Sequence, residues 1–145
     1  MSTASHDLNR FVEAQHAIYS QVIAELATGR KQTHWMWFIF PQIAGLGFSA
    51  MAQRFAVGSR AEAEAYLEHP LLGPRLIECT GLVLGVSGKS IRAILGSPDD
   101  LKFRSSMTLF DAVSDHAIFS EAIAKYYAGD KDPATLAILA RMAGG

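Results

Sequence analysis

Two segments of the sequence bring aromatic and polar groups together, and their residue types could do chemistry. The first is HWMWFIFPQ, which begins at His34, ends at Gln42 and contains Trp35 and Trp37. Aromatic walls with a few directed polar groups are what a pocket for a small molecule requires. His34 is the candidate acid or base if the chain is an enzyme, a question that the sequence leaves open. The alternative is that the aromatic residues are core and that His34 is a helix-start group or a buried histidine.

The second segment, DDLKFRSSMTLF at residues 99–110, places a lysine among hydroxyl groups. Helical spacing puts Lys102 and Ser106 on one side and Ser105 and Thr108 on an adjoining side. A lysine and hydroxyls near a helix start could hold an anion, although the two aspartates that open the segment oppose it. The alternative is that the hydroxyl residues are small groups that let helices approach closely, with Lys102 paired to a carboxylate.

A third cluster combines Arg75, Glu78 and Cys79, which share a helix face at spacings of three and four. This arrangement suggests a cysteine nucleophile with charged helpers, and His69 is the nearest histidine in the sequence. A catalytic cysteine needs a lowered pKa, whereas a cysteine among leucines in mid-helix is typically an inert buried hydrophobe. We therefore expect Cys79 to be structural.

Other common chemistries lack their sequence signatures. The five histidines are scattered and no paired-cysteine or calcium-loop spacing is present, so we expect no bound metal. The chain also lacks the glycine-rich loops that bind nucleotide phosphates and the nucleophile elbow of hydrolases. We therefore expect no cofactor.

Composition and charge restrict the class of protein further. The chain has 145 residues, of which 50% are hydrophobic, and a net charge of −1. Such a chain can bury a core, and it has no overall field to attract nucleic acid or an anionic membrane. The start of the sequence lacks the pattern of a signal peptide, the apolar stretch from Trp35 to Phe48 is too short to span a bilayer, and Cys79 is the only cysteine. These features favour the cytoplasm, without nucleic-acid or membrane partners.

The positions of capping residues, glycines and prolines predict an all-α chain with almost no strand. Apolar spacing predicts a first helix over residues 8–28, capped by Asp7 and ended by Gly29. Ser49, Asp132 and the capping box of Ser59 with Glu62 mark further helix starts. The remaining expected helices are residues 33–40 from Thr33, 71–86, 97–113 from Ser97 and Pro98, and 115–127 from Asp115, with a short turn at residues 91–95.

Together these patterns predict one compact array of about seven to nine short helices. We expect a single domain over residues 1–145, with a flexible tail at residues 1–6. An irregular orthogonal bundle and a superhelix of helix pairs both satisfy the helix order.

Three segments also carry a resemblance to a known family. HWMWFIFPQ, HPLLGPRL at residues 69–76 and DDLKFRSSMTLF resemble a bacterial family known as domain of unknown function 1810. The resemblance implies an all-α single domain and no established activity. Some members carry the label calpastatin, which names a disordered protease inhibitor, whereas this composition is that of a compact helical domain. The motif residues form the candidate ligand-binding list: His34, Trp37, Gln42, His69, Arg75, Lys102, Ser105, Ser106 and Thr108.

Two functions fit these residues. The first is a pocket for a small anionic or nucleotide-like ligand, in which Trp35 or Trp37 stacks on the ligand and Lys102, Arg75 and the hydroxyls bind its charge. This hypothesis requires that His34, Arg75, Lys102 and Ser106 converge on one cavity. The alternative is a helical protein-interaction module without chemistry, whose partner binds a groove between helices.

Overall fold

A computed structural model describes the backbone of residues 7–144, which form ten helices and no strand. The helices are α1 (Asn9–His16), α2 (Tyr19–Ala27), α3 (Met36–Ile39), α4 (Ala50–Arg54), α5 (Arg60–Glu68), α6 (Leu72–Leu84), α7 (Ile91–Leu95), α8 (Asp99–Ala112), α9 (Ala117–Tyr127) and α10 (Pro133–Gly144). The all-α prediction is confirmed. The tail expected over residues 1–6 lies outside the described residues.

Three helix starts form where local side chains predict them. Ser49 and Ser59 each accept a hydrogen bond at 3.1 Å from the backbone N–H three residues ahead, which opens α4 and α5. Asp132 accepts from the backbone N–H of Thr135 at 3.1 Å and so opens α10. The carboxylate of Glu62 reaches back to the N–H of Gly58 at 2.6 Å, one residue earlier than in the usual capping box.

The single helix expected over residues 8–28 is wrong, because α1 and α2 are separated by Ala17 and Ile18. The buried side chain of Gln15 donates from Nε2 to the backbone oxygen of Phe38 at 2.7 Å, which ties the end of α1 to α3. Beyond the break, α2 contacts α6 instead. Apolar spacing in the sequence cannot report that the two halves pack against different partners.

Three expected caps are also wrong: Asp7, Thr33 and Asp115. The residues before α1, α3 and α9 are Leu8, Trp35 and His116, and none of them makes a side-chain cap hydrogen bond. The hydroxyl of Thr33 instead donates to Glu25 at 2.7 Å. Thr33 therefore makes a hydrogen bond to another helix in place of the local one that a helix cap requires.

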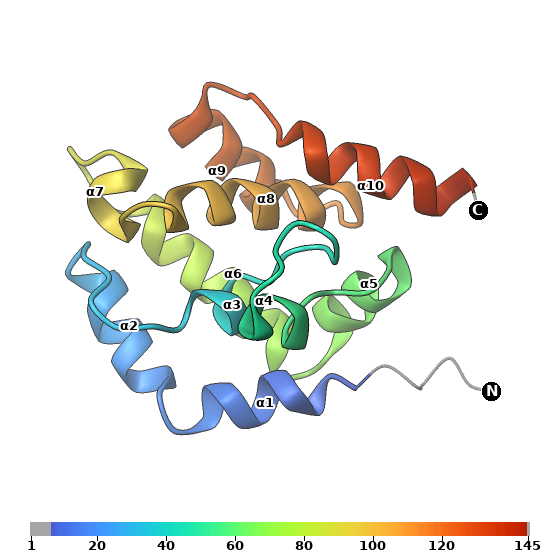
Figure 1. Cartoon of the computed structure of the whole chain (residues 1–145). Helices are drawn as coiled ribbons and strands as arrows, with labels where there is room; N and C mark the ends of the chain where they lie inside the picture. Colours follow the sequence, from blue (N-terminus) through green and yellow to red (C-terminus); the bar gives the residue numbers. More distant parts are fainter. Residues whose placement is uncertain (1–6, 145) are drawn as a thin grey trace.

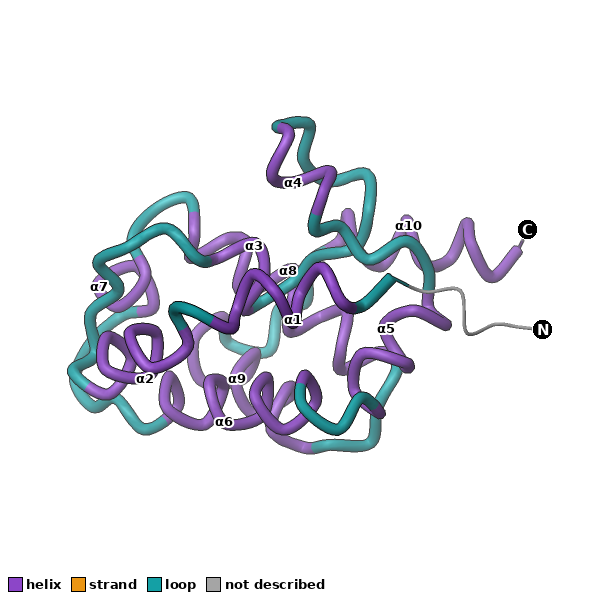
Figure 2. The backbone as a smooth tube through the Cα atoms, turned by 90° about the horizontal axis from the view of Figure 1, so that it is seen from below, coloured by secondary structure: helices purple, strands orange, loops and turns teal. Residues whose placement is uncertain are grey.

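The core lies around α8, the golden helix that crosses the centre of Figure 1. Helix α8 contacts α5, α7, α9 and α10. Its buried aromatic residues pack against aromatic residues of neighbouring elements. Measured between ring centroids, Phe103 lies edge-on to Phe40 at 4.9 Å. Phe110 lies 5.5 Å from Tyr66 and 5.8 Å from Phe119. The helices cross in several directions around this core in Figures 1 and 2, as in an irregular bundle.

Helix α4 and the loops beside it project from the rest of the chain, as Figure 2 shows. We call residues 44–56 the α4 arm. Its two ends are joined by an isolated parallel bridge between Ile43 and Val57. Across this bridge, the N–H of Val57 donates to the oxygen of Gln42, and the N–H of Ala44 donates to the oxygen of Val57, each at 2.8 Å. The base of the arm is therefore fixed.

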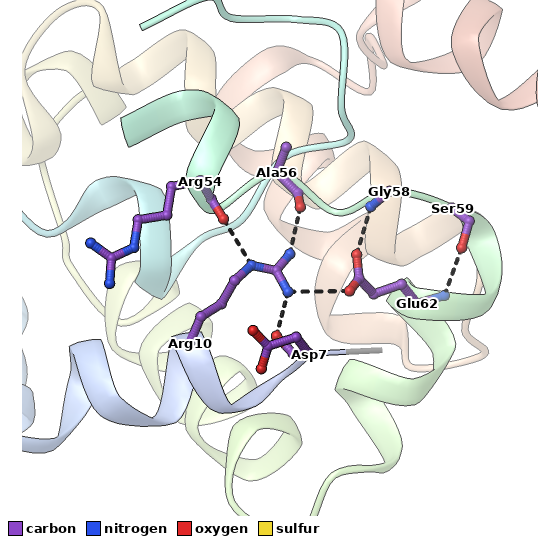
Figure 3. A network of polar contacts seen from close by, with 7 residues as sticks. All are labelled: Asp7, Arg10, Arg54, Ala56, Gly58, Ser59 and Glu62. Atoms are coloured by element: carbon purple, nitrogen blue, oxygen red, sulfur yellow. Dashed lines mark hydrogen bonds and ion pairs between the residues drawn. The ribbon is translucent and has the colours of Figure 1, made fainter. Parts of the chain in front are cut away.

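The guanidinium of Arg10 provides a second anchor for the arm (Figure 3). Its Nε donates to the oxygen of Arg54 at 2.8 Å, and its Nη2 donates to the oxygen of Ala56 at 2.6 Å. The same group lies 3.3 Å from the carboxylate of Glu62 and hydrogen-bonds the oxygen of Asp7. Arg10 thus ties the end of the arm to α1 and α5.

Within the described residues, no helix combines the length and the apolar character needed to cross a membrane.

Candidate functional site

The aromatic segment at residues 34–42 and the lysine-containing segment at residues 99–110 meet in space. The ammonium of Lys102, in the first turns of α8, lies 4.9 Å from the centroid of the Trp37 ring on α3. Trp37 and Lys102 both line two adjoining hollows. This contact is the centre of the candidate site.

The smaller hollow has a volume of about 270 Å³. Its lining includes Lys31, His34, Trp37, Gly96, Asp99 and Lys102. The larger hollow has a volume of about 350 Å³, and its lining includes Trp37, Gln42, Phe48, Leu101, Lys102 and Ser105. Ligand pockets usually measure roughly 300–1,000 Å³, so each hollow fits at most a small group.

The charges at the smaller hollow are two lysines and one carboxylate. Asp99 lies 2.9 Å from the ammonium of Lys31 and 3.5 Å from that of Lys102. The Lys31 side chain is 8% exposed and the Lys102 side chain is 26% exposed. Lys31 is therefore buried in its ion pair with Asp99, whereas Lys102 makes a longer ion pair and remains accessible to a ligand.

The neighbouring Asp100 faces a different part of the chain. The Tyr127 hydroxyl hydrogen-bonds to its backbone oxygen. Burial, together with the nearby Asp100 carboxylate, raises the pKa of Tyr127. The charge of Asp100 thus lies near α9. Asp99 is the acidic residue in the lining of the smaller hollow, where it competes with an anion for the lysines.

A buried carboxylate positions the loop that carries Lys31 and His34. Glu25 of α2 is 3% exposed and lies behind this loop. It accepts from the backbone N–H groups of Gln32 and Thr33 at 2.8 and 3.1 Å and from the indole N–H of Trp35 at 2.9 Å. The Thr33 hydroxyl and the Gln21 amide complete five hydrogen bonds, at 2.7 and 2.8 Å. Such a network fixes the loop only while Glu25 is ionised.

The stability of the chain should fall in acid because of Glu25. Burial by itself raises the pKa of this carboxyl, but the bonds from Thr33, Gln32, Gln21 and Trp35 outweigh burial and lower the pKa from 4.5 to about 2. The contribution is therefore complete above the unfolded pKa and is lost as the pH falls from about 4.5 toward 2. Urea unfolding across this range should show a loss of about 3 kcal/mol that Glu25→Gln lacks. Equal pH slopes for both proteins would contradict the role given to Glu25.

Arg75 and His69 lie away from the two hollows. Arg75 donates to the side-chain oxygen of Gln15 at 3.2 Å, and its guanidinium lies 4.3 Å from the centroid of the Tyr19 ring. The Nδ1 of His69 accepts from the backbone N–H groups of Leu71 and Leu72 at 3.1 and 3.2 Å, which supports the start of α6. Both side chains thus have structural partners.

The three hydroxyl residues of α8 separate as well. Ser105 lines the larger hollow, and its hydroxyl lies 3.1 Å from the carboxylate of Asp132. Thr108 donates to the oxygen of Arg104 at 2.8 Å and accepts from the N–H of Asp132 at 3.0 Å, which holds the loop before α10. Ser106 is fully buried and has no hydrogen-bond partner within the described part of the chain.

The predicted pocket that joins His34, Arg75, Lys102 and Ser106 is therefore wrong: His34 and Lys102 line the smaller hollow, whereas Arg75 and Ser106 line neither hollow. What the structure leaves is a smaller candidate site around Lys102 and His34.

Cys79 has the environment of an inert thiol. It is fully buried in α6. Burial raises its pKa to about 12, although the hydroxyl of Tyr19 at 3.7 Å acts in the opposite direction. A thiol of this kind is not a nucleophile near neutral pH. Among the described residues, no group of three or more His, Cys, Asp or Glu side chains is arranged to hold a metal ion.

Three residues that shape this site were not predicted from the sequence: Glu25, Lys31 and Phe48. Glu25 lies three residues after Val22 and so falls on the buried side of its helix, where a charged residue signals a buried polar network. Phe48 follows Gly47 in a segment rich in glycine, where an aromatic side chain has no helix face to join. Lys31 had no local signal of its role, because its partner Asp99 is distant in the sequence.

Comparisons with known proteins agree with the motifs. The model of a family described as "Protein of unknown function (DUF1810)" matches residues 5–139. A search of curated proteins found no match. Among solved structures, the chain is similar to the crystal structure of the conserved hypothetical protein Rv1873 from Mycobacterium tuberculosis. The two chains are 56% identical with a TM-score of 0.92, and the match covers 92% of this chain and 96% of that chain.

Proposed function

The chain belongs to this DUF1810 family of proteins of unknown function, and from its own geometry we propose that it binds a small anionic molecule at the smaller hollow. The observation that carries the proposal is the position of Lys102. Its ammonium lies over Trp37, is partly exposed and makes only a long ion pair with Asp99. A cation held in this way is a directed binding group for an anion.

The aromatic neighbour strengthens this role of Lys102. The face of an indole attracts a cation and restricts the flexible lysine side chain, so less conformational freedom is lost when a ligand binds. Lys31 keeps Asp99 in place at 2.9 Å. The site is therefore built before the ligand arrives, with one cation available and its competitor carboxylate fixed.

His34 adds a group that could take part in a reaction. It lines the same hollow and its side chain is exposed. Binding of an anion is the minimum function of the site, and acid or base catalysis by His34 is its extension. Comparing ligand turnover by the original chain and by His34→Ala separates the two.

The first test is a thermal-shift screen of phosphate and of small phosphorylated and carboxylated metabolites. A ligand at about a hundred times its dissociation constant should add roughly 2.7 kcal/mol of stability. Lys102→Gln should abolish the shift. Lys125→Gln is the matched control, because Lys125 of α9 lines neither hollow. Its ammonium bonds the backbone oxygens of Leu84 and Val86, so the quantity compared is the shift that ligand adds to each variant's own melting temperature.

Asp99→Asn provides a test in the opposite direction. Removing the competing carboxylate should raise the affinity for an anion by about two- to fivefold, which corresponds to the worth of a partly exposed ion pair. Binding that is unchanged in both Lys102→Gln and Asp99→Asn would place the anion elsewhere and overturn the proposal.

The alternative function, a protein-interaction module, has one observation in its favour. Phe48, Leu101 and Leu136 are large apolar side chains with exposed fractions of 82%, 57% and 41%. Phe48 and Leu101 line the same hollow, and exposed apolar groups that lie together often mark a binding surface. A screen without any small-molecule hit, together with self-association or peptide binding that Phe48→Ala removes, would favour this function instead.

A further inference from the structure

We infer that the ligand of this site also carries a flat aromatic ring, which lies in the larger hollow with Phe48 as its outer wall. This inference rests on the proposed anion site, because it concerns the other end of the same molecule. It assigns a binding role to Phe48 and narrows the ligand to a nucleotide-like class, in which an aromatic ring is joined to an anionic group.

The exposure of Phe48 is the first observation behind this inference. A phenylalanine that is 82% exposed contacts water over most of its ring, at a cost that burial would relieve. The ring belongs to the lining of the larger hollow, which also includes Trp37 and Leu101. A planar ligand inserted here would cover apolar surface from all three residues at once.

The backbone around Phe48 is held in place although its side chain is exposed. The Gln53 side chain donates to the oxygen of Phe48 at 2.7 Å, and Ser49 caps the helix that follows. Before Phe48, Gly47 allows a close approach, because a Cβ there would lie 2.8 Å from the Cβ of Ala52. The backbone of the α4 arm thus holds the Phe48 ring at a fixed position on the surface.

The two hollows can hold the two ends of a single ligand. Trp37 and Lys102 line both of them, so an anion at Lys102 has the larger hollow directly beside it. The volume of about 350 Å³ suits one ring system and excludes a large cofactor. The small volume of the larger hollow therefore favours a mononucleotide over a dinucleotide.

Gln42 supplies the polar group that a heteroaromatic edge requires. Gln42 belongs to the lining of the larger hollow, and its backbone oxygen is fixed by the hydrogen bond from the N–H of Val57. A carboxamide can donate and accept hydrogen bonds at the same time, which matches the edge of a nucleobase. Ser105 and Asp132 are bonded to each other and are less available.

The experiment measures the affinity of the full chain for ribose 5-phosphate and for a panel of purine and pyrimidine nucleoside 5′-monophosphates by calorimetry. We expect at least one monophosphate to bind about tenfold or more tightly than ribose 5-phosphate, as stacking of a base on aromatic side chains predicts. Phe48→Ala should lower the affinity for that monophosphate to the level of ribose 5-phosphate, whereas Phe48→Tyr should preserve the advantage of the monophosphate. Because Phe48 is exposed, neither substitution should unfold the chain.

The possible outcomes distinguish the aromatic-ring site at Phe48 from the anion site at Lys102. Equal binding of ribose 5-phosphate and every nucleotide, or a ring preference that survives Phe48→Ala, overturns the inference while the anion site stands. Lack of binding by every phosphate compound overturns the inference, and the anion site falls as well if the carboxylated metabolites of the thermal-shift screen also fail to bind.

Discussion

The substitution Gly73→Ala is expected to lower the free energy of unfolding by about 3 kcal/mol or more. Gly73 is a buried residue in the first turn of α6, where this helix meets the end of α5. A Cβ at this position would lie 2.1 Å from the backbone oxygen of Leu67 and 2.9 Å from its carbonyl carbon. The obstacle is backbone, so it cannot move aside as a flexible side chain would. The two helices would have to separate at their junction.

The control for Gly73 lies in the same helix. At Gly81 the nearest atom to an added Cβ is the Cδ1 of Ile118, at an ordinary contact distance of 3.8 Å. Gly81→Ala should therefore stabilise the chain by about 0.5–1 kcal/mol through the higher helix propensity of alanine. Urea denaturation of both variants measures the contrast. Similar free energies of unfolding for the two variants would contradict the close approach of α5 and α6 at Gly73.

The substitution Glu25→Ala is expected to lower the free energy of unfolding by about 3–5 kcal/mol, because it removes the acceptor of five hydrogen bonds at once. The indole N–H of Trp35 would suffer most, since this side chain is 1% exposed and water cannot easily replace the carboxylate. Glu25→Gln should also be costly, because its NH₂ group would face other donors.

Urea unfolding at neutral pH measures these losses. Glu13→Gln is the matched control, because Glu13 is an exposed glutamate of α1, and its effect should stay within about 0.5 kcal/mol. A loss for Glu25→Gln no larger than that of the control would contradict the buried network. In any Glu25 variant that remains folded, anion binding should also weaken, since the loop that carries Lys31 and His34 is released.

Those parts of the fold that depend on neighbours in the sequence were predictable. The caps at Ser49, Ser59 and Asp132 arise from contacts three residues apart, so the residue types alone indicate the helix starts. Gly29 ends α2 in the conformation with positive φ, 76°, that glycine favours. The break between α1 and α2 was not predictable, because the two helices pack against different elements: Gln15 of α1 bonds Phe38 of α3, whereas α2 contacts α6.

The candidate site divides in the same way. The sequence by itself identified the aromatic and lysine-containing motifs, the structural character of Cys79 and the all-α class, because residue type and helical spacing carry that information. Only the tertiary structure brought Lys102 over Trp37, set Asp99 between two lysines and directed Arg75 elsewhere. The physical reason is that these contacts join side chains of different helices, and their meeting depends on how the helices pack around α8 rather than on any local preference.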